Sequence, residues 1–159
     1  MNSATALAPK QALTNRQAIF WGGLIAGVLD AIDGVIAYGT QGLNPVQVLQ
    51  YIASGALGKS AFQGGLATAA IGAAFHFSIA WVAAAVFVLA SRRLEILKTH
   101  AVLAGLLYGA AVYFFMNYLV LPLSAVAPAT FQLGLFLNGV IGHAVFVGLP
   151  ISLFARRAQ

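Results

Sequence analysis

Two aspartates, Asp30 and Asp33, are the residues of this chain whose type and spacing point most directly to chemistry. They lie in the middle of an apolar run over residues 17–39, which is long enough to cross a bilayer, since a spanning helix needs about 20 residues. Being three residues apart, they lie on neighbouring ridges of one helix face. A carboxylate at bilayer depth costs about 2.5–3.5 kcal/mol on insertion scales. Two of them within one turn therefore require a stabilising partner or a function.

The chemistry open to this pair follows from the low dielectric constant of the bilayer interior. Two carboxylates one turn apart do not both stay ionised there, so that one keeps a proton or a cation lies between them. The functional interpretation is a proton- or cation-binding site. The structural alternative is a protonated carboxyl pair that hydrogen-bonds to another helix. We favour the first because acidic residues inside membranes are functional by default.

The composition sets the class of protein that must hold this pair. Hydrophobic residues make up 61% of the 159 residues and charged residues 7%, against about 25% charged in soluble domains. This predicts a helical membrane protein of one domain. The absence of cysteine excludes disulfides and thiolate metal sites. The net charge of +5 does not indicate nucleic acid as a partner, because the basic residues flank the apolar runs, as they do in membrane proteins.

The predicted fold is all-α: an integral membrane four-helix bundle with a short extra helix between its first two spans. Residues 1–16 form a cytoplasmic N-terminal segment. Residues 17–157 form a single transmembrane domain, with spans at about 17–39, 65–90, 100–121 and 131–154. The extra helix, over residues 44–58, begins with Asn44 as N-cap and Pro45 at its first position. It is too short to span, and two placements stay open: re-entrant or lying flat at the outer surface.

The basic residues predict the orientation of the bundle. One side of the predicted topology carries seven of the eight basic residues, and the other side carries only Lys59. Basic residues accumulate on the cytoplasmic side of membrane proteins, so both termini are predicted to be cytoplasmic. The seven are Lys10, Arg16, Arg92, Arg93, Lys98, Arg156 and Arg157.

Further polar side chains are expected at the same depth as the aspartates. At a rise of 1.5 Å per residue, six polar side chains on the four predicted helices fall within roughly two helical turns of depth. They are Asp30, Asp33, His76, Asn117, Asn138 and His143. His76 lies on a stripe of small residues in the second span. In the fourth span, Asn138 and His143 are about 140° apart, which predicts that one of them serves a different helix contact. The supporting polar residues are Tyr113, Asn117, Asn138 and His143.

The histidines allow three interpretations. His76 and His143 can each hydrogen-bond to a neighbouring helix and do nothing else. They can bind a first-row divalent metal together with Asp30 or Asp33, as a mixed nitrogen and oxygen ligand set. They can also be the two axial ligands of a haem. No Glu-x-x-His motif of the di-iron bundles is present, and the two histidines differ in depth by about 4–5 Å. We therefore expect no bound cofactor.

Five segments of the chain carry a resemblance to known proteins. They are IASGALG at 52–58, AFQGG at 61–65, HFSIA at 76–80, MNYLVLPLS at 116–124, and the tail from GLP at 148–150 to Arg157. In these segments the chain resembles a group of small four-helix bacterial inner-membrane proteins, and it is distantly similar to the YagU group. The resemblance covers most of the chain after Gly22. It implies the four-helix topology and a multi-pass protein of the bacterial cytoplasmic (inner) membrane, and it implies no activity.

The predicted function is a proton- or cation-linked transporter or channel rather than an enzyme. Asp30 and Asp33 form the titrating pair, with His76 as its nearest relay partner. The alternatives are a membrane metal- or haem-binding protein and a non-transporting structural or accessory subunit. The expected partners are the lipid bilayer and a small ion or small-molecule substrate, with no nucleic acid. A homo-oligomer is also expected, because four helices enclose little room.

Overall fold

The computed structural model describes residues 12–128 and 130–159, and it confirms the all-α four-helix membrane bundle. The first span is α1 (Asn15–Gly39) and the second is α3 (Gly65–Ser91). The third span is α5 (Ala101–Phe115) continued by the π-helical turn η2 (Met116–Val120). The fourth span is α6 (Leu133–Gly142), the π-helical turn η3 (His143–Gly148) and α7 (Leu149–Arg156). All four are long and apolar enough to cross a membrane, and every bound lies within two residues of the predicted one.

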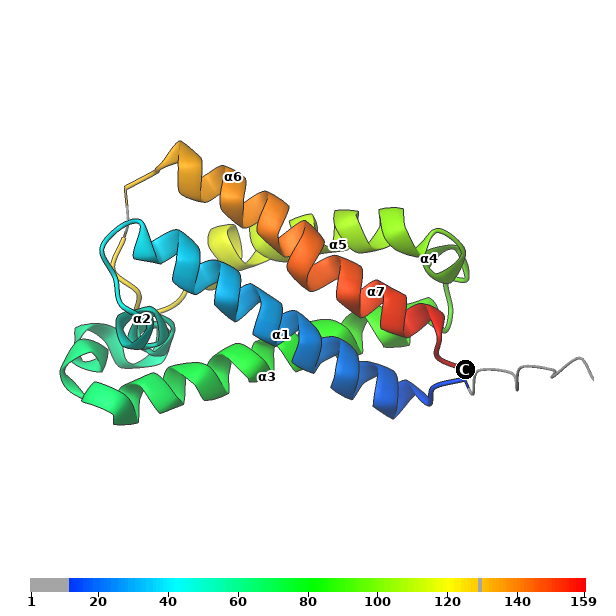
Figure 1. Ribbon diagram of the computed structural model, residues 1–159, viewed down its shortest axis with the longest axis horizontal. Helices are drawn as coiled ribbons and strands as arrows, with labels where there is room; N and C mark the ends of the chain where they lie inside the picture. Colours follow the sequence, from blue (N-terminus) through cyan, green and yellow to red (C-terminus); the bar gives the residue numbers. More distant parts are fainter. Residues whose placement is uncertain (1–11, 129) are drawn as a thin grey trace, which may run out of the picture.

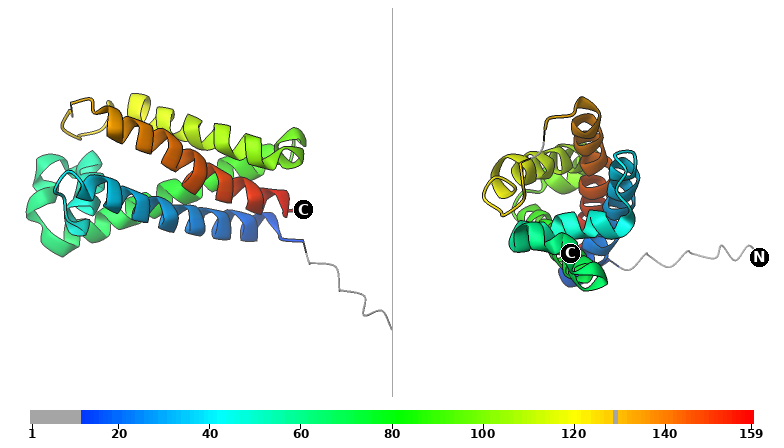
Figure 2. Two further views of the ribbon diagram at one scale, coloured as in Figure 1. Left: turned by 45° about the horizontal axis from the view of Figure 1, so that its top comes forward. Right: turned by 90° about the vertical axis from the view of Figure 1, so that its left-hand side faces the viewer.

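In the bundle, α1 lies between the second and the fourth spans (Figures 1 and 2). It packs against α3 on one side and against η3 and α7 on the other, while α5 packs mainly on η3 and α7. Small residues allow these close approaches, as they do in membrane bundles generally. A Cβ atom at Gly23 would overlap Trp81, and one at Gly27 would lie 2.8 Å from the ring of Phe77. Gly34, also on α1, faces open space.

Both described ends of the chain meet at one end of the bundle. The Leu13 N–H donates to the Arg157 carbonyl at 2.8 Å, and the Gln159 N–H donates to the Leu13 carbonyl at 3.0 Å. Lys98 Nζ donates to the carbonyl of Ala158 at 3.1 Å. An even number of spans separates the described basic residues other than Lys59, so these residues all lie at this end. They are Arg16, Arg92, Arg93, Lys98, Arg156 and Arg157. Lys10 and most of the predicted N-terminal segment 1–16 lie outside the described residues.

The extra helix between the first two spans is α2 (Pro45–Leu57), followed by the 3₁₀ turn η1 (Gly58–Gln63). Asn44 caps it as predicted, and Gln47 completes a reciprocal capping box. The helix lies across the end of the bundle, viewed almost along its axis in Figure 1. Buried Gln50 ties it to α3 by donating to the Gly65 carbonyl at 3.0 Å. This transverse placement favours a helix lying flat over a re-entrant one.

Each π-helical turn precedes a proline by one residue. The Leu121 N–H bonds to the carbonyl of Met116, five residues back, just before Pro122. Leu149 bonds in the same way to Ala144, just before Pro150. A proline has no N–H to donate, and its ring clashes with the carbonyl four residues earlier. A π turn is wider than an α-helical turn and relieves this clash. The fourth span accommodates Pro150 in this way.

Candidate functional site

The centre of the candidate site is the contact between Asp30 on α1 and His143 at the start of η3. Nδ1 of His143 lies 3.5 Å from Oδ1 of Asp30, and the two side chains are only 23% and 20% exposed. Nδ1 itself is buried and forms no hydrogen bond within the described residues, so it contacts this carboxylate without donating to it at this separation. An imidazole and a carboxylate that lie this close need only a small approach to share a proton, either as a neutral pair or as an ion pair.

Asp33 has its own partner on the fourth span. Nδ2 of Asn138 donates to Oδ2 of Asp33 at 2.9 Å. Gly142, one turn after Asn138, makes room for this carboxylate, because a Cβ atom at Gly142 would lie only 2.5 Å from the same oxygen. Asp33 therefore binds an uncharged donor, and in residues 12–128 and 130–159 no basic side chain forms an ion pair with it.

The two carboxylates are thus paired in antiparallel order with two residues of one helix. Along α1 Asp30 precedes Asp33, and along the returning fourth span Asn138 precedes His143. The prediction that Asn138 and His143 serve different helices is wrong, since both contact α1. The reason is that the two carboxylates are themselves about 60° apart around α1, so the partner side chains can approach from a wide angle and still reach them.

His76 is placed elsewhere in the bundle. Its Nε2 lies 2.8 Å from the carbonyl oxygen of Gly27, so that α3 is joined to the backbone of α1. Its ring meets Phe77 edge-on, with centroids 5.3 Å apart. Within the described residues no ion pair joins His76 to Asp30 or Asp33. The structure therefore makes His143 the histidine nearest to a carboxylate, and not His76 as predicted, because the ring of His76 on α3 is held at the backbone carbonyl of Gly27.

Tyr113 packs against the site, whereas the side-chain hydrogen bond of Asn117 does not reach it. The buried ring of Tyr113 lies edge-on to the His143 imidazole, with centroids 5.4 Å apart. It forms an aromatic wall beside the pair. Asn117 donates from Nδ2 to the carbonyl of Tyr113 at 3.0 Å, one turn earlier on its own helix. Its one hydrogen bond thus stays within the third span and does not link it to the carboxylates.

Comparisons of the chain with protein families, with curated proteins and with solved structures found no match. The resemblance to the small four-helix inner-membrane proteins stays a prediction.

The metal interpretation has His76 and His143 bind one ion together with Asp30 or Asp33. Across residues 12–128 and 130–159, no three His, Asp or Glu side chains come together as a ligand set. Asp30 and His143 supply two donors to one point, whereas His76 is directed to a backbone carbonyl. Within the described residues, the side chains that the metal interpretation needs are therefore not gathered around one point.

Sequence reasoning missed two glycines that shape the site. Gly142 makes room for Asp33, and Gly139 makes room for the ring of Tyr113, which a Cβ atom there would overlap. The available signal was the pattern Asn138-Gly139-x-x-Gly142-His143. In this pattern Asn138 and His143 each stand next to a glycine, which allows a neighbouring helix to approach at that depth.

Proposed function

We propose that this protein is a proton- or cation-linked transporter or channel of the bacterial cytoplasmic membrane, with both termini in the cytoplasm. The observation that carries the proposal is the Asp30–His143 contact, an acid and an imidazole 3.5 Å apart and about four-fifths buried between two apolar spans. Acidic and histidine residues placed together inside a membrane are the usual components of proton relays. A structural role alone would need only one neutral hydrogen-bonding group.

The charge balance of the site suggests what it carries. Asp30 and a protonated His143 neutralise each other, while Asp33 is held by the uncharged amide of Asn138. With Asp33 ionised, the three groups carry one net negative charge in a poorly screened environment. Binding of one proton or one monovalent cation removes that charge. The site is therefore suited to load and release a single positive charge.

The orientation and the oligomeric state belong to the same proposal. The end of the bundle at which Leu13 and Arg157 are hydrogen-bonded also carries Arg92, Arg93 and Arg156, and Lys59 stands on η1 at the other end. The positive-inside rule assigns the first end to the cytoplasm. A homo-oligomer would give a transported ion a wider path than four helices alone enclose.

The test is proton flux in proteoliposomes that contain a trapped pH-sensitive dye and are driven by a potassium diffusion potential. Wild-type protein should acidify or alkalinise the lumen according to the sign of the potential. Asp30→Asn keeps the size and hydrogen bonding of the side chain but cannot be ionised, and it should abolish the flux. His143→Gln should do so as well.

Glu95→Gln is the matched control, because it makes the same chemical change at an exposed carboxylate outside the spans. It should leave the flux unchanged. If Asp30→Asn and Glu95→Gln carry equal flux, Asp30 is not part of the path. If the wild type carries none although it is folded and inserted, a structural or accessory subunit becomes the better account.

A further inference from the structure

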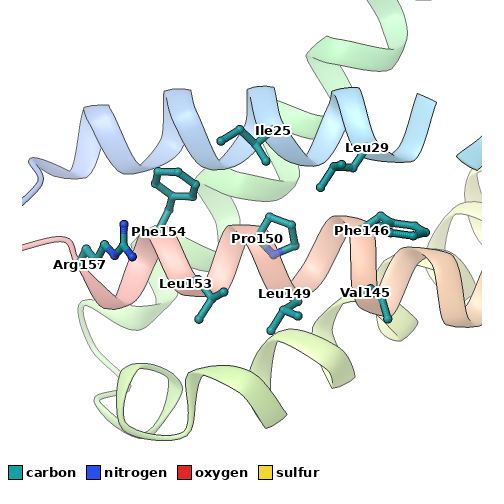
Figure 3. Close-up of a pocket in the computed structure, with 9 residues that line it drawn as sticks. All are labelled: Ile25, Leu29, Val145, Phe146, Leu149, Pro150, Leu153, Phe154 and Arg157. Atoms are coloured by element: carbon teal, nitrogen blue, oxygen red, sulfur yellow. The ribbon is translucent and has the colours of Figure 1, made fainter. Parts of the chain in front are cut away.

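A groove of about 400 Å³ runs between α1 and the fourth span on the surface of the bundle (Figure 3). Its walls are apolar side chains from both helices, among them Ile25 and Leu29 on α1 and Phe146 and Leu149 on the fourth span. The groove is open to its surroundings, since Ile25 is 37% exposed. Arg157 lies at one end, and Leu29 and Phe146 lie at the other.

The dimensions of the groove correspond to one lipid chain in one leaflet. Its lining extends from Val145 to Arg157, twelve residues that rise about 18 Å at 1.5 Å each. Half of a hydrocarbon core of about 30 Å is about 15 Å. The volume spread over that length gives a width of roughly 5 Å, which suits a single hydrocarbon chain at carbon contact distances of about 3.5–4 Å. A helix, about 10 Å across, is too wide for it.

Arg157 supplies the polar end of such a site. Its side chain is exposed, and in residues 12–128 and 130–159 no carboxylate forms an ion pair with it. A guanidinium group presents paired N–H donors that match the oxygens of a phosphate. Arg156 lies beside it, and Arg16 lines a second apolar groove on the other side of α1. An anion is favoured at this end by all of these charges.

We propose that this groove binds one acyl chain of an anionic phospholipid, with the lipid phosphate on Arg157. The lipid belongs to the leaflet on the side of the termini, where the basic residues gather. Anionic headgroups are preferred to zwitterionic ones because a net negative charge is attracted to this end as a whole. The site is independent of the Asp30–His143 pair, so its test does not depend on whether the protein transports ions.

The experiment is native mass spectrometry of the delipidated full-length protein in detergent, titrated with phosphatidylglycerol or with phosphatidylcholine of the same acyl chains. The first phosphatidylglycerol should bind more tightly than the first phosphatidylcholine. Arg157→Gln should weaken phosphatidylglycerol binding about fivefold, the usual effect of one arginine near an anionic lipid surface. Arg93→Gln, the same change at this end but outside the groove lining, should weaken it less than twofold.

A second pair of variants tests the apolar part. Leu153→Trp fills the groove from a lining side chain that is already 38% exposed, and it should weaken the binding of both lipids. Leu107→Trp places the same indole on an exposed position of α5 away from the groove, and it should have no effect. Equal effects of Arg157→Gln and Arg93→Gln would mean attraction to the basic end in general and would overturn the site. So would unchanged lipid binding in Leu153→Trp, or equal affinity for the two lipids.

Discussion

Gly109 on α5 should be the glycine whose replacement by alanine most directly disturbs both the packing and the candidate site. A Cβ atom at Gly109 would overlap the carbonyl of His143 and lie 2.6 Å from Cα of Ala144. Carbon atoms in contact are normally about 3.5–4 Å apart, so α5 and η3 must separate by about 1 Å. Both obstacles are backbone atoms, and no flexible side chain can move aside. Overpacking of this kind costs about 1–3 kcal/mol.

The matched control is Gly34→Ala on α1, where a new methyl group meets nothing within 4 Å. There, alanine should stabilise by about 0.5–1 kcal/mol, because it restricts the unfolded chain and favours helix. At about 2–4 °C per kcal/mol, Gly109→Ala should melt about 2–12 °C below the wild type and Gly34→Ala slightly above it. The assay is a thermal melt in detergent followed by the fluorescence of Trp21 and Trp81. If the two variants melt alike, the close approach of α5 to η3 is wrong.

Three further predictions concern topology, the second carboxylate and haem. Since the chain has no cysteine, Lys59→Cys should react with an impermeant maleimide on intact cells, and Arg93→Cys only after the cells are permeabilised; the reverse pattern would overturn the orientation. Asn138→Ala removes the 2.9 Å hydrogen bond to Asp33 and should lower the unfolding free energy by about 1 kcal/mol in denaturant titrations. An unchanged unfolding free energy would mean that this hydrogen bond does not stabilise the fold. The absorbance spectrum of the purified protein should contain no Soret band, and a band that His76→Ala removes would promote the haem-binding alternative.

The helices were predictable because membrane spans are encoded by long uninterrupted apolar runs. Every spanning helix had to satisfy its backbone hydrogen bonds internally, so the run over residues 17–39 could only become a helix, and it did. The start of α2 was predictable from the local sequence alone, because Asn44 followed by Pro45 is typical of a helix N-terminus whatever the rest of the chain does. Tertiary contacts were not needed for either prediction.

The depth of the polar side chains in the membrane was predictable, but which of them pair was not. The rise per residue brought Asp30, Asp33, Asn138 and His143 to similar depths, and the structure does bring these four together. Which histidine reaches the carboxylates depends on how each helix is rotated about its own axis. That rotation is set by contacts such as Gly27 against Phe77, which direct His76 to a backbone carbonyl. A sequence alone does not give those contacts.

The π turn η3 explains how one residue can serve the site and the packing at once. In a regular helix, His143 and Gly148, five residues apart, would differ by about 140° in direction. A π turn has hydrogen bonds between residues five apart, which brings the two onto one side. Here both meet Gly109: its Cβ would overlap the carbonyl of His143, and a Cβ at Gly148 would lie 2.5 Å from its backbone nitrogen. The carbonyl of His143 thus packs against α5, while its imidazole faces Asp30 on α1. The proline that forces the wide turn therefore helps to fix the geometry of a site two turns away from it.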